Sequence, residues 1–224
     1  MKRAFACAAA MAALFTASAA SAQDADVAFN VGVFSDYVFR GFSQTNEDPA
    51  LQGGVDLTAG SFYAGAWASN VDFGDDTDAE IDIYGGFRTE AAGYALDFGV
   101  VGYFYVNAPG GADYDYVEFK AAASRAIGPV TAGAVVYYSP DFFGLDEEAT
   151  YVEGNLAWAF ADKWAASGAV GYQALDVNDD YTTWNAGVTY TLVEGLGVDV
   201  RYFDTDVDGP LSDDRIVGSL KYSF

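Results

Sequence analysis

Apolar and polar residues alternate with a period of two along most of the chain beyond about residue 25. From Ala79 to Thr89, the odd positions are mainly apolar, whereas the even positions include Glu80, Asp82 and Arg88. Successive side chains of a β-strand point to opposite faces, so each such segment has one apolar and one polar face. The pattern predicts an all-β protein. The twelve expected strands are 28–42, 50–58, 62–72, 79–89, 94–106, 115–124, 129–139, 149–160, 164–175, 182–192, 196–205 and 215–224.

Short and long connections alternate between these segments. The six long connections contain 17 acidic residues and no Lys or Arg, whereas the five short ones contain three acids and two bases. Short turns at one end and longer loops at the other are typical of outer-membrane barrels. The short connections are 59–61, 90–93, 125–128, 161–163 and 193–195. The long connections are 43–49, 73–78, 107–114, 140–148, 176–181 and 206–214.

These features predict a transmembrane, antiparallel, up-and-down β-barrel of about 12 strands. Most of the expected strands have about the 9–11 residues that a tilted strand needs to cross a bilayer. We expect the short turns to be periplasmic and the acidic loops to be extracellular. The expected extracellular acids are Asp75, Asp76, Asp78, Asp146, Glu147, Glu148, Asp179, Asp180, Asp213 and Asp214.

Both ends of the chain agree with export to the outer membrane. Lys2 and Arg3 precede a small-residue apolar run that ends in Ala20-Ser21-Ala22, the pattern of a cleaved signal peptide. We therefore expect residues 1–22 to be removed and 23–224 to form a single outer-membrane barrel domain. At the other end, Tyr222 and Phe224 close an alternating apolar strand, which resembles the signal that barrel-assembly machinery reads.

Composition narrows the function. The chain has no His, and its one cysteine, Cys7, lies in the expected signal peptide. Ser-His-Asp catalysis, thiol chemistry and Cys- or His-ligated metals are thereby excluded. The net charge of −23 becomes 8 − 33 = −25 after cleavage, because two of the ten bases are lost. Such a surface repels nucleic acid. We expect no enzyme activity, no cofactor and no metal.

Two acidic groups are candidates for chemistry. Glu80 and Asp82 are the nearest candidates for a carboxylate pair of the kind that cleaves glycosides, but their spacing is what any polar barrel face shows. The run from Asp75 to Asp78 offers clustered oxygens to a hard cation such as calcium. It lacks the spacing and glycine of an EF-hand, so a solvated hairpin tip is the favoured interpretation.

Strand parity assigns charged residues of both signs to the polar face, which is the lumen in a membrane barrel. Opposite charges can line a narrow conducting pore, or they can pair and plug it, since interior width grows with strand number and buried charges need partners. The expected lumen-lining residues are Asp36, Arg40, Asp56, Glu80, Asp82, Arg88, Asp97, Glu118, Lys120, Glu153, Asp199 and Arg201.

Several motifs resemble the TorF family of porins. The segments SDYVFRGFSQT at 35–45 and PALQGGVDL at 49–57 are similar to the opening of that family, and YYSPDF at 137–142 and YTTWNAGVTYTL at 181–192 match further along. The resemblance spans nearly the whole chain after the expected signal peptide. It implies an outer-membrane β-barrel of Gram-negative bacteria with a pore function, and it supplies no catalytic residues.

Taken together, the residues favour a porin that allows passive passage of small solutes or ions, with a preference for cations. The expected partners are outer-membrane lipid, lipopolysaccharide, barrel-assembly machinery and the solutes themselves. Two alternatives stay open. A non-conducting structural or adhesive barrel would have a salt-bridged, plugged interior, and a soluble β-sandwich would turn the same apolar faces inward.

Overall fold

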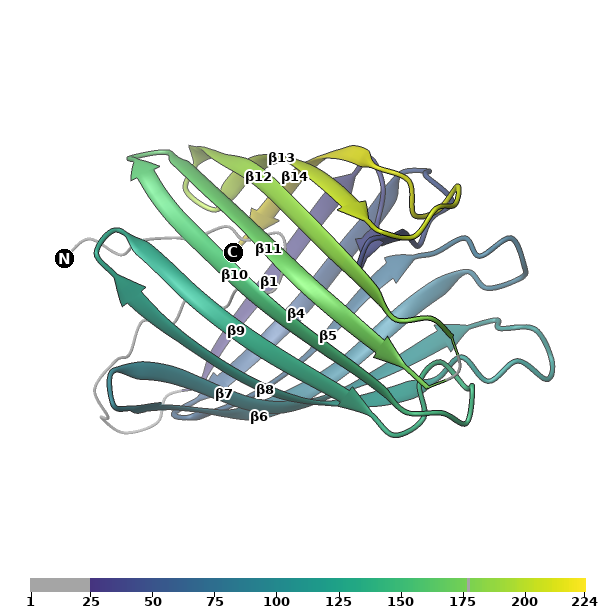
Figure 1. Cartoon of the computed structure of the whole chain (residues 1–224). Coiled ribbons are helices and arrows are strands. Elements are labelled where there is room, and N and C mark those ends of the chain that lie inside the picture. Colours follow the sequence, from purple (N-terminus) through teal and green to yellow (C-terminus); the bar gives the residue numbers. More distant parts are fainter. Residues whose placement is uncertain (1–24, 177) are drawn as a thin grey trace.

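The computed structural model describes residues 25–176 and 178–224, and the predicted signal peptide, 1–22, lies outside them. Twelve antiparallel strands close into a barrel in the order β1-β14-β13-β12-β11-β10-β9-β8-β7-β6-β5-β4 (Figure 1). This confirms the predicted fold class and strand number. The barrel strands are β1 (Asp26–Phe34), β4 (Ala50–Ala59), β5 (Phe62–Asn70), β6 (Ala79–Ala91), β7 (Tyr94–Val106), β8 (Tyr116–Ile127), β9 (Val130–Ser139), β10 (Ala149–Ala161), β11 (Trp164–Leu175), β12 (Tyr181–Val193), β13 (Leu196–Thr205) and β14 (Arg215–Ser223).

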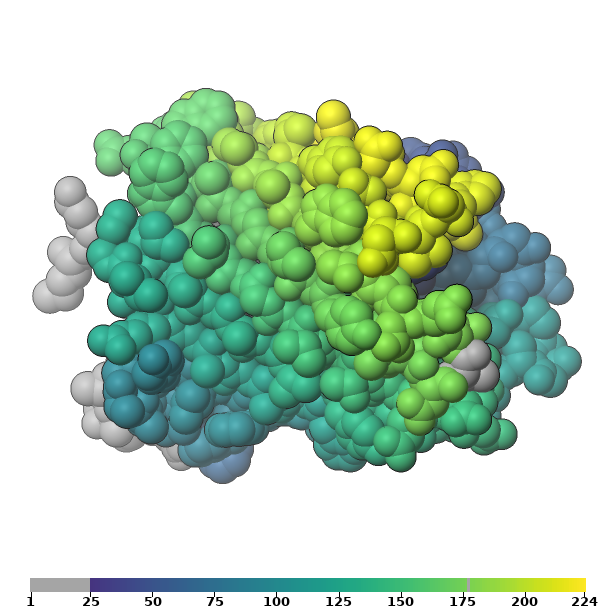
Figure 2. Space-filling model, in the orientation of Figure 1, coloured from purple at the N-terminus to yellow at the C-terminus, as the bar shows by residue number. Residues whose placement is uncertain are grey.

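The barrel is apolar outside and polar inside. Val188, Ile83 and Leu156 point outward and are 39%, 57% and 57% exposed, whereas Glu118 and Arg201 point inward and are 1% and 2% exposed. On the side of the barrel that Figure 2 shows, the outer wall forms a continuous surface. This is the reverse of a soluble domain, in which apolar side chains fill the core. Among the described residues, no helix is long and apolar enough to cross a membrane.

Connections at the two ends of the barrel differ in length, as the sequence predicts. The turns at one end have two residues each, and the longer connections lie at the other end (Figure 1). In the turn at 92–93, Ala92 and Gly93 have φ of 53° and 79°, as a type I′ hairpin turn requires. The short turns are 60–61, 92–93, 128–129, 162–163 and 194–195. The long connections are 35–49, 71–78, 107–115, 140–148, 176–180 and 206–214.

The first predicted strand, 28–42, is wrong at its C-terminal end. Strand β1 stops at Phe34, and residues 35–49, which we call the inner segment, fold into the barrel. The inner segment contains a hairpin of β2 (Val38–Phe39) and β3 (Phe42–Ser43). A period of two continues through a hairpin as it does through a strand, so the alternation does not reveal where the chain leaves the wall.

Candidate functional site

The inner segment crosses the lumen at the long-loop end of the barrel. On one side, the Tyr37 ring packs edge-on against Trp67 of β5 at a centroid distance of 5.3 Å, and its hydroxyl donates to Glu80 of β6 at 3.1 Å. On the other side, the Phe42 ring contacts Tyr181 of β12 at 5.2 Å. The inner segment therefore touches opposite parts of the wall and constricts the interior.

The tip of the hairpin is formed by Arg40 and Gly41, whose φ values of 47° and 93° give the tight turn. A positive φ is unfavourable for arginine, and such strain persists only where surrounding contacts fix it. Gly41 is required for space as well, because a Cβ there would lie 2.7 Å from Oγ1 of Thr183. The tight turn aims the Arg40 side chain at the far wall.

Arg40 contacts four strands of that wall, β8 to β11, and a residue of a fifth strand, β7, supports its partner Glu118. Its two terminal nitrogens donate to Oε1 and Oε2 of Glu118 at 2.8 and 2.7 Å, and Nη1 also donates to Gln173 at 3.0 Å. The guanidinium lies over the rings of Tyr151 and Tyr137, at 4.3 and 5.2 Å from their centroids. The fifth residue, Tyr103, donates its hydroxyl to Glu118 at 3.0 Å.

This ion pair is buried, because only 6% of the Arg40 side chain and 1% of the Glu118 side chain are exposed. Burial by itself would lower the pKa of Arg40. The adjacent Glu118 carboxylate outweighs that effect and holds the pKa of Arg40 above its usual value. The guanidinium is therefore charged at every physiological pH.

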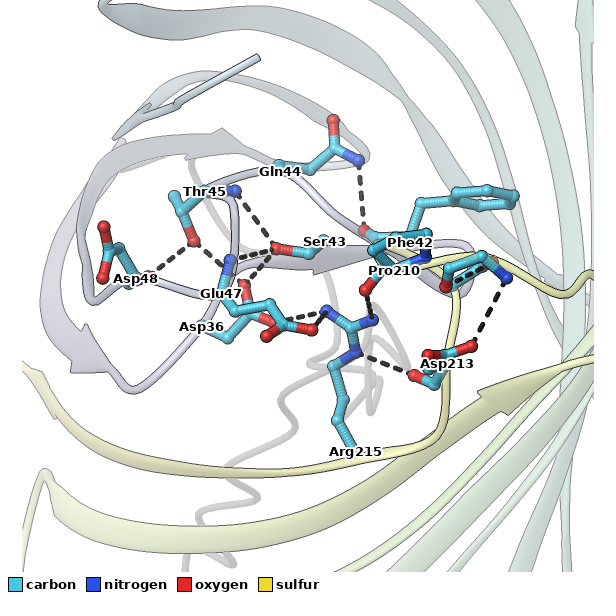
Figure 3. Close-up of polar contacts among 12 residues, drawn as sticks. Asp36, Phe42, Ser43, Gln44, Thr45, Glu47, Asp48, Pro210, Asp213 and Arg215 are labelled. Carbon is cyan, nitrogen blue, oxygen red and sulfur yellow. Dashed lines mark hydrogen bonds and ion pairs between the residues drawn. The ribbon is translucent and has the colours of Figure 1, made fainter. Parts of the chain in front are cut away.

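The base of the inner segment is anchored by Asp36 (Figure 3). Its Oδ1 accepts from the hydroxyls of Ser43 and Thr45 at 2.7 and 2.9 Å, and its Oδ2 accepts from Arg215 of β14 at 3.0 Å. Arg215 also lies 3.6 Å from Glu47. Asp36 and Arg40 were expected on one strand face, but they lie on the inner segment instead and pair with different parts of the barrel.

A second charged group lies nearer the short-turn end. Asp97 accepts from Lys120 at 2.7 Å and from the Tyr63 hydroxyl at 2.7 Å, and Arg88 lies 3.7 Å away. The Arg88 guanidinium stacks on Tyr63 at 4.0 Å from the ring centroid. Strand register explains the grouping, because Arg88 and Asp97 are directly paired across β6 and β7.

The third charged group is Arg201 with Asp199 on β13. Arg201 donates to Asp199 at 3.2 Å and to Asn185 at 2.8 Å, and Thr189 donates to Asp199 at 2.7 Å. A Cβ on Gly187 would lie 2.8 Å from Cζ of Arg201, so glycine at that position lets the guanidinium lie flat against the wall.

Of the four other inward carboxylates, three accept a hydrogen bond from a tyrosine hydroxyl. Asp56 accepts from the Tyr84 hydroxyl at 2.7 Å, Glu153 accepts from Tyr151 at 2.9 Å, and Glu80 accepts from Tyr37. Oδ1 of Asp82 is buried without a hydrogen-bond partner among the described residues. Among those same residues, no Lys or Arg lies within ion-pair distance of these four acids.

The acidic loop residues predicted to be extracellular are all exposed. Some are held by local hydrogen bonds. Asp180 accepts from the Tyr172 hydroxyl at 2.5 Å and from the Leu175 N–H at 2.9 Å, and these bonds lower the pKa of Asp180. Asp75 accepts from Tyr114 at 3.0 Å. Within the part of the chain that the structure describes, no three acids gather closely enough to hold a metal ion.

The C-terminal aromatics lie on the outer face at the short-turn end. The Tyr222 and Phe224 rings stack at 5.2 Å, and Phe224 also stacks on Phe29 at 5.7 Å. Backbone hydrogen bonds of 2.8 and 2.9 Å join Phe29 and Phe224. The terminal residues thus help to close the barrel between β14 and β1.

Sequence reasoning missed the aromatic and amide residues that surround Arg40, because it considered only charged groups. The available signal was the alternation of each strand, which places on its lumen face Tyr103, Tyr137, Tyr151 and Gln173. Their convergence on one guanidinium depended on the inner segment, which no pattern in the sequence places in the lumen.

Comparisons with known proteins agree with this architecture. The family model described as "Bacterial protein of unknown function (Gcw_chp)" matches residues 17–221. A search of curated proteins gave no match. Among solved structures, a KdgM porin is similar with a TM-score of 0.63 and 8% identity, covering 88% of this chain and 99% of that one. A NanC porin gives 0.58 and 12%, covering 89% and 99%.

A third similar structure is the COG4313 outer membrane channel from Pseudomonas putida F1, with a TM-score of 0.53, 10% identity, and coverage of 92% and 96%. At these identities the structural similarity establishes the fold. The chain belongs to the Gcw_chp family. That description does not carry the TorF name, so the resemblance to the TorF family stays a prediction.

Proposed function

We propose that this Gcw_chp protein is an outer-membrane channel that allows passive passage of small solutes or ions and prefers cations. The fold it shares with the porins, together with the exposed apolar wall, supports a location in the outer membrane. The partners are then outer-membrane lipid, lipopolysaccharide and the barrel-assembly machinery. Nothing in the interior resembles the His-based machinery of an outer-membrane hydrolase, because the chain has no His, and we propose no catalytic role.

One observation carries the preference for cations. Four lumen carboxylates, Asp56, Glu80, Asp82 and Glu153, have no basic partner among the described residues, whereas Asp36, Asp97, Glu118 and Asp199 are ion-paired. The partly exposed Asp56 and Glu153 supply fixed negative charge to the lumen, which concentrates cations and repels anions. The exposed loop acids add to this effect at the mouth.

Reversal potentials across a KCl gradient test the preference, using purified protein in planar bilayers. The wild type should give a potential of cationic sign. Asp56→Asn with Glu153→Gln should reduce it, and so should the matched loop pair Asp146→Asn with Glu147→Gln. Only the loop effect should disappear at high salt, because the Debye length falls from about 10 Å at 0.1 M to about 3 Å at 1 M. A wild-type potential of anionic sign would contradict the proposal.

The inner segment supports a second candidate function. Its contacts with both sides of the wall are what a plugged structural or adhesive barrel would have. Conductance measured on the same bilayers separates the two candidates. Discrete conductance steps support the channel, whereas an absence of conductance from correctly folded protein supports the plugged barrel.

A further inference from the structure

We propose that the barrel wall around Arg40 is a binding site for guanidinium compounds, and that Arg40 occupies it as a tethered internal ligand. The site consists of Tyr103, Glu118, Tyr137, Tyr151 and Gln173, one residue from each of β7 to β11. The proposal deepens the proposed function, on which it rests, by naming a solute class and the event that opens the lumen.

The wall, rather than the inner segment, holds this site together. Strand register places Tyr151 directly opposite Tyr137 on one neighbour and opposite Gln173 on the other. Tyr103 and Glu118 lie on the paired strands β7 and β8 and are joined by a hydrogen bond of 3.0 Å. Because ladder hydrogen bonds fix the backbone at all five positions, the five side chains stay grouped on one stretch of the wall when the inner segment is elsewhere.

The inner segment can leave without opening the wall. Strands β1 and β4 pair along their whole length, from Asp26 with Thr58 to Phe34 with Ala50. Residues 35–49 are therefore a loop between two strands that already hydrogen-bond to each other. Side-chain contacts and a few backbone hydrogen bonds, such as that from the Ser43 N–H to the Leu211 carbonyl at 2.8 Å, hold the loop in the lumen.

The chemistry of the site selects the ligand. Glu118 presents both oxygens in the plane that accepts two parallel N–H donors, which a guanidinium offers and an ammonium does not. The rings of Tyr137 and Tyr151 add cation–π attraction on the faces of the ligand. If Arg40 departs alone, Glu118 is left as a buried charge without a partner, which is strongly unfavourable. Departure is therefore coupled to the arrival of another cation.

The first test removes the internal ligand. Purified Arg40→Ala in detergent micelles should be stabilised by millimolar ethylguanidinium, with the folded-to-unfolded ratio rising about tenfold at ten times the dissociation constant. Urea, which has the donors without the charge, should have no such effect, and ethylammonium should act more weakly. Arg40→Ala with Glu118→Gln should lose the response. Equal responses to urea and ethylguanidinium, or none to either, would overturn the proposal.

The second test leaves Arg40 in place, so it holds even if Arg40→Ala does not fold. Val38 is partly buried in the hairpin of the inner segment, and its side chain makes no hydrogen bond, so a Val38→Cys thiol in a Cys7→Ser background should react slowly with a thiol reagent. Ethylguanidinium should raise the labelling rate several-fold by displacing Arg40, and urea should not. An unchanged rate would refute the displacement. Both tests are made in detergent and need no conduction. A barrel that does not conduct in bilayers would therefore contradict the channel function without contradicting the binding site.

Discussion

The outward face of the barrel should tolerate no charge near the middle of a strand. Val188 is 39% exposed, points outward and is one residue from the centre of β12 (Tyr181–Val193). A strand rises about 3.4 Å per residue, so Val188 lies within a few ångströms of the expected bilayer midplane. Val188→Lys should therefore destabilise the folded barrel in lipid by about 2–4 kcal/mol.

The neighbouring residue provides the matched control. Thr189 points into the lumen, is 6% exposed and donates to Asp199 at 2.7 Å. Thr189→Lys loses that hydrogen bond, at about 1 kcal/mol, but its ammonium lies beside the Asp199 carboxylate and near the other polar groups of the lumen. The same charge placed one residue further along the strand should therefore cost less.

Urea unfolding in lipid vesicles measures both variants against the wild type. In a soluble protein the outward position would be a water-exposed surface site, where Val188→Lys changes stability by only about 0.5 kcal/mol, and the buried Thr189→Lys would be the worse variant. Equal costs, or that reversed order, would refute the assignment of the apolar face to lipid. Repeating the measurement at Ile83, which is 57% exposed on β6, separates a local effect from a general one.

Two further predictions concern the inner segment and the orientation of the barrel. Arg40→Ala and Glu118→Gln should each lower the free energy of unfolding by about 3–5 kcal/mol, because each leaves a buried charge without its partner. The double variant should lose less than the sum of the two single losses. Strict additivity would show that the pair is not coupled. An epitope between Gly144 and Leu145, in the exposed connection 140–148, should bind antibody on intact cells, whereas an epitope at Asp162 should not; the opposite labelling would invert the proposed topology.

The wall of the barrel could be predicted from the sequence because its two signals are local. Alternation such as Ile81, Ile83 and Phe87 against Glu80 and Asp82 sets which face each side chain takes. Connection length separates two-residue hairpin turns from longer loops. Both signals arise within a few residues, so no long-range information is needed, and the closed barrel follows from repeating the antiparallel pairing until β14 meets β1.

The contents of the lumen could not be predicted in the same way. Asp36 and Arg40 share parity, as residues of one strand would, yet a tight turn at Arg40 and Gly41 reverses the chain between Phe39 and Phe42. Arginine is uncommon at a positive φ, so the sequence gives no strong turn signal there. The turn forms because long-range contacts of Arg40 with four strands stabilise it, and such contacts leave no local pattern.

The charged lumen residues show the same division between local and long-range information. The pair Asp199 and Arg201 was recognisable because the two residues are adjacent on one strand face, and the structure joins them at 3.2 Å. Glu118 and Lys120 also share a face, but each has a distant partner, Arg40 and Asp97 respectively. Spacing along a strand therefore indicates which charges share the lumen, whereas the register between strands and the path of the inner segment decide which acids remain without a base. That remainder, rather than the total count of acids and bases, is what sets the proposed cation preference.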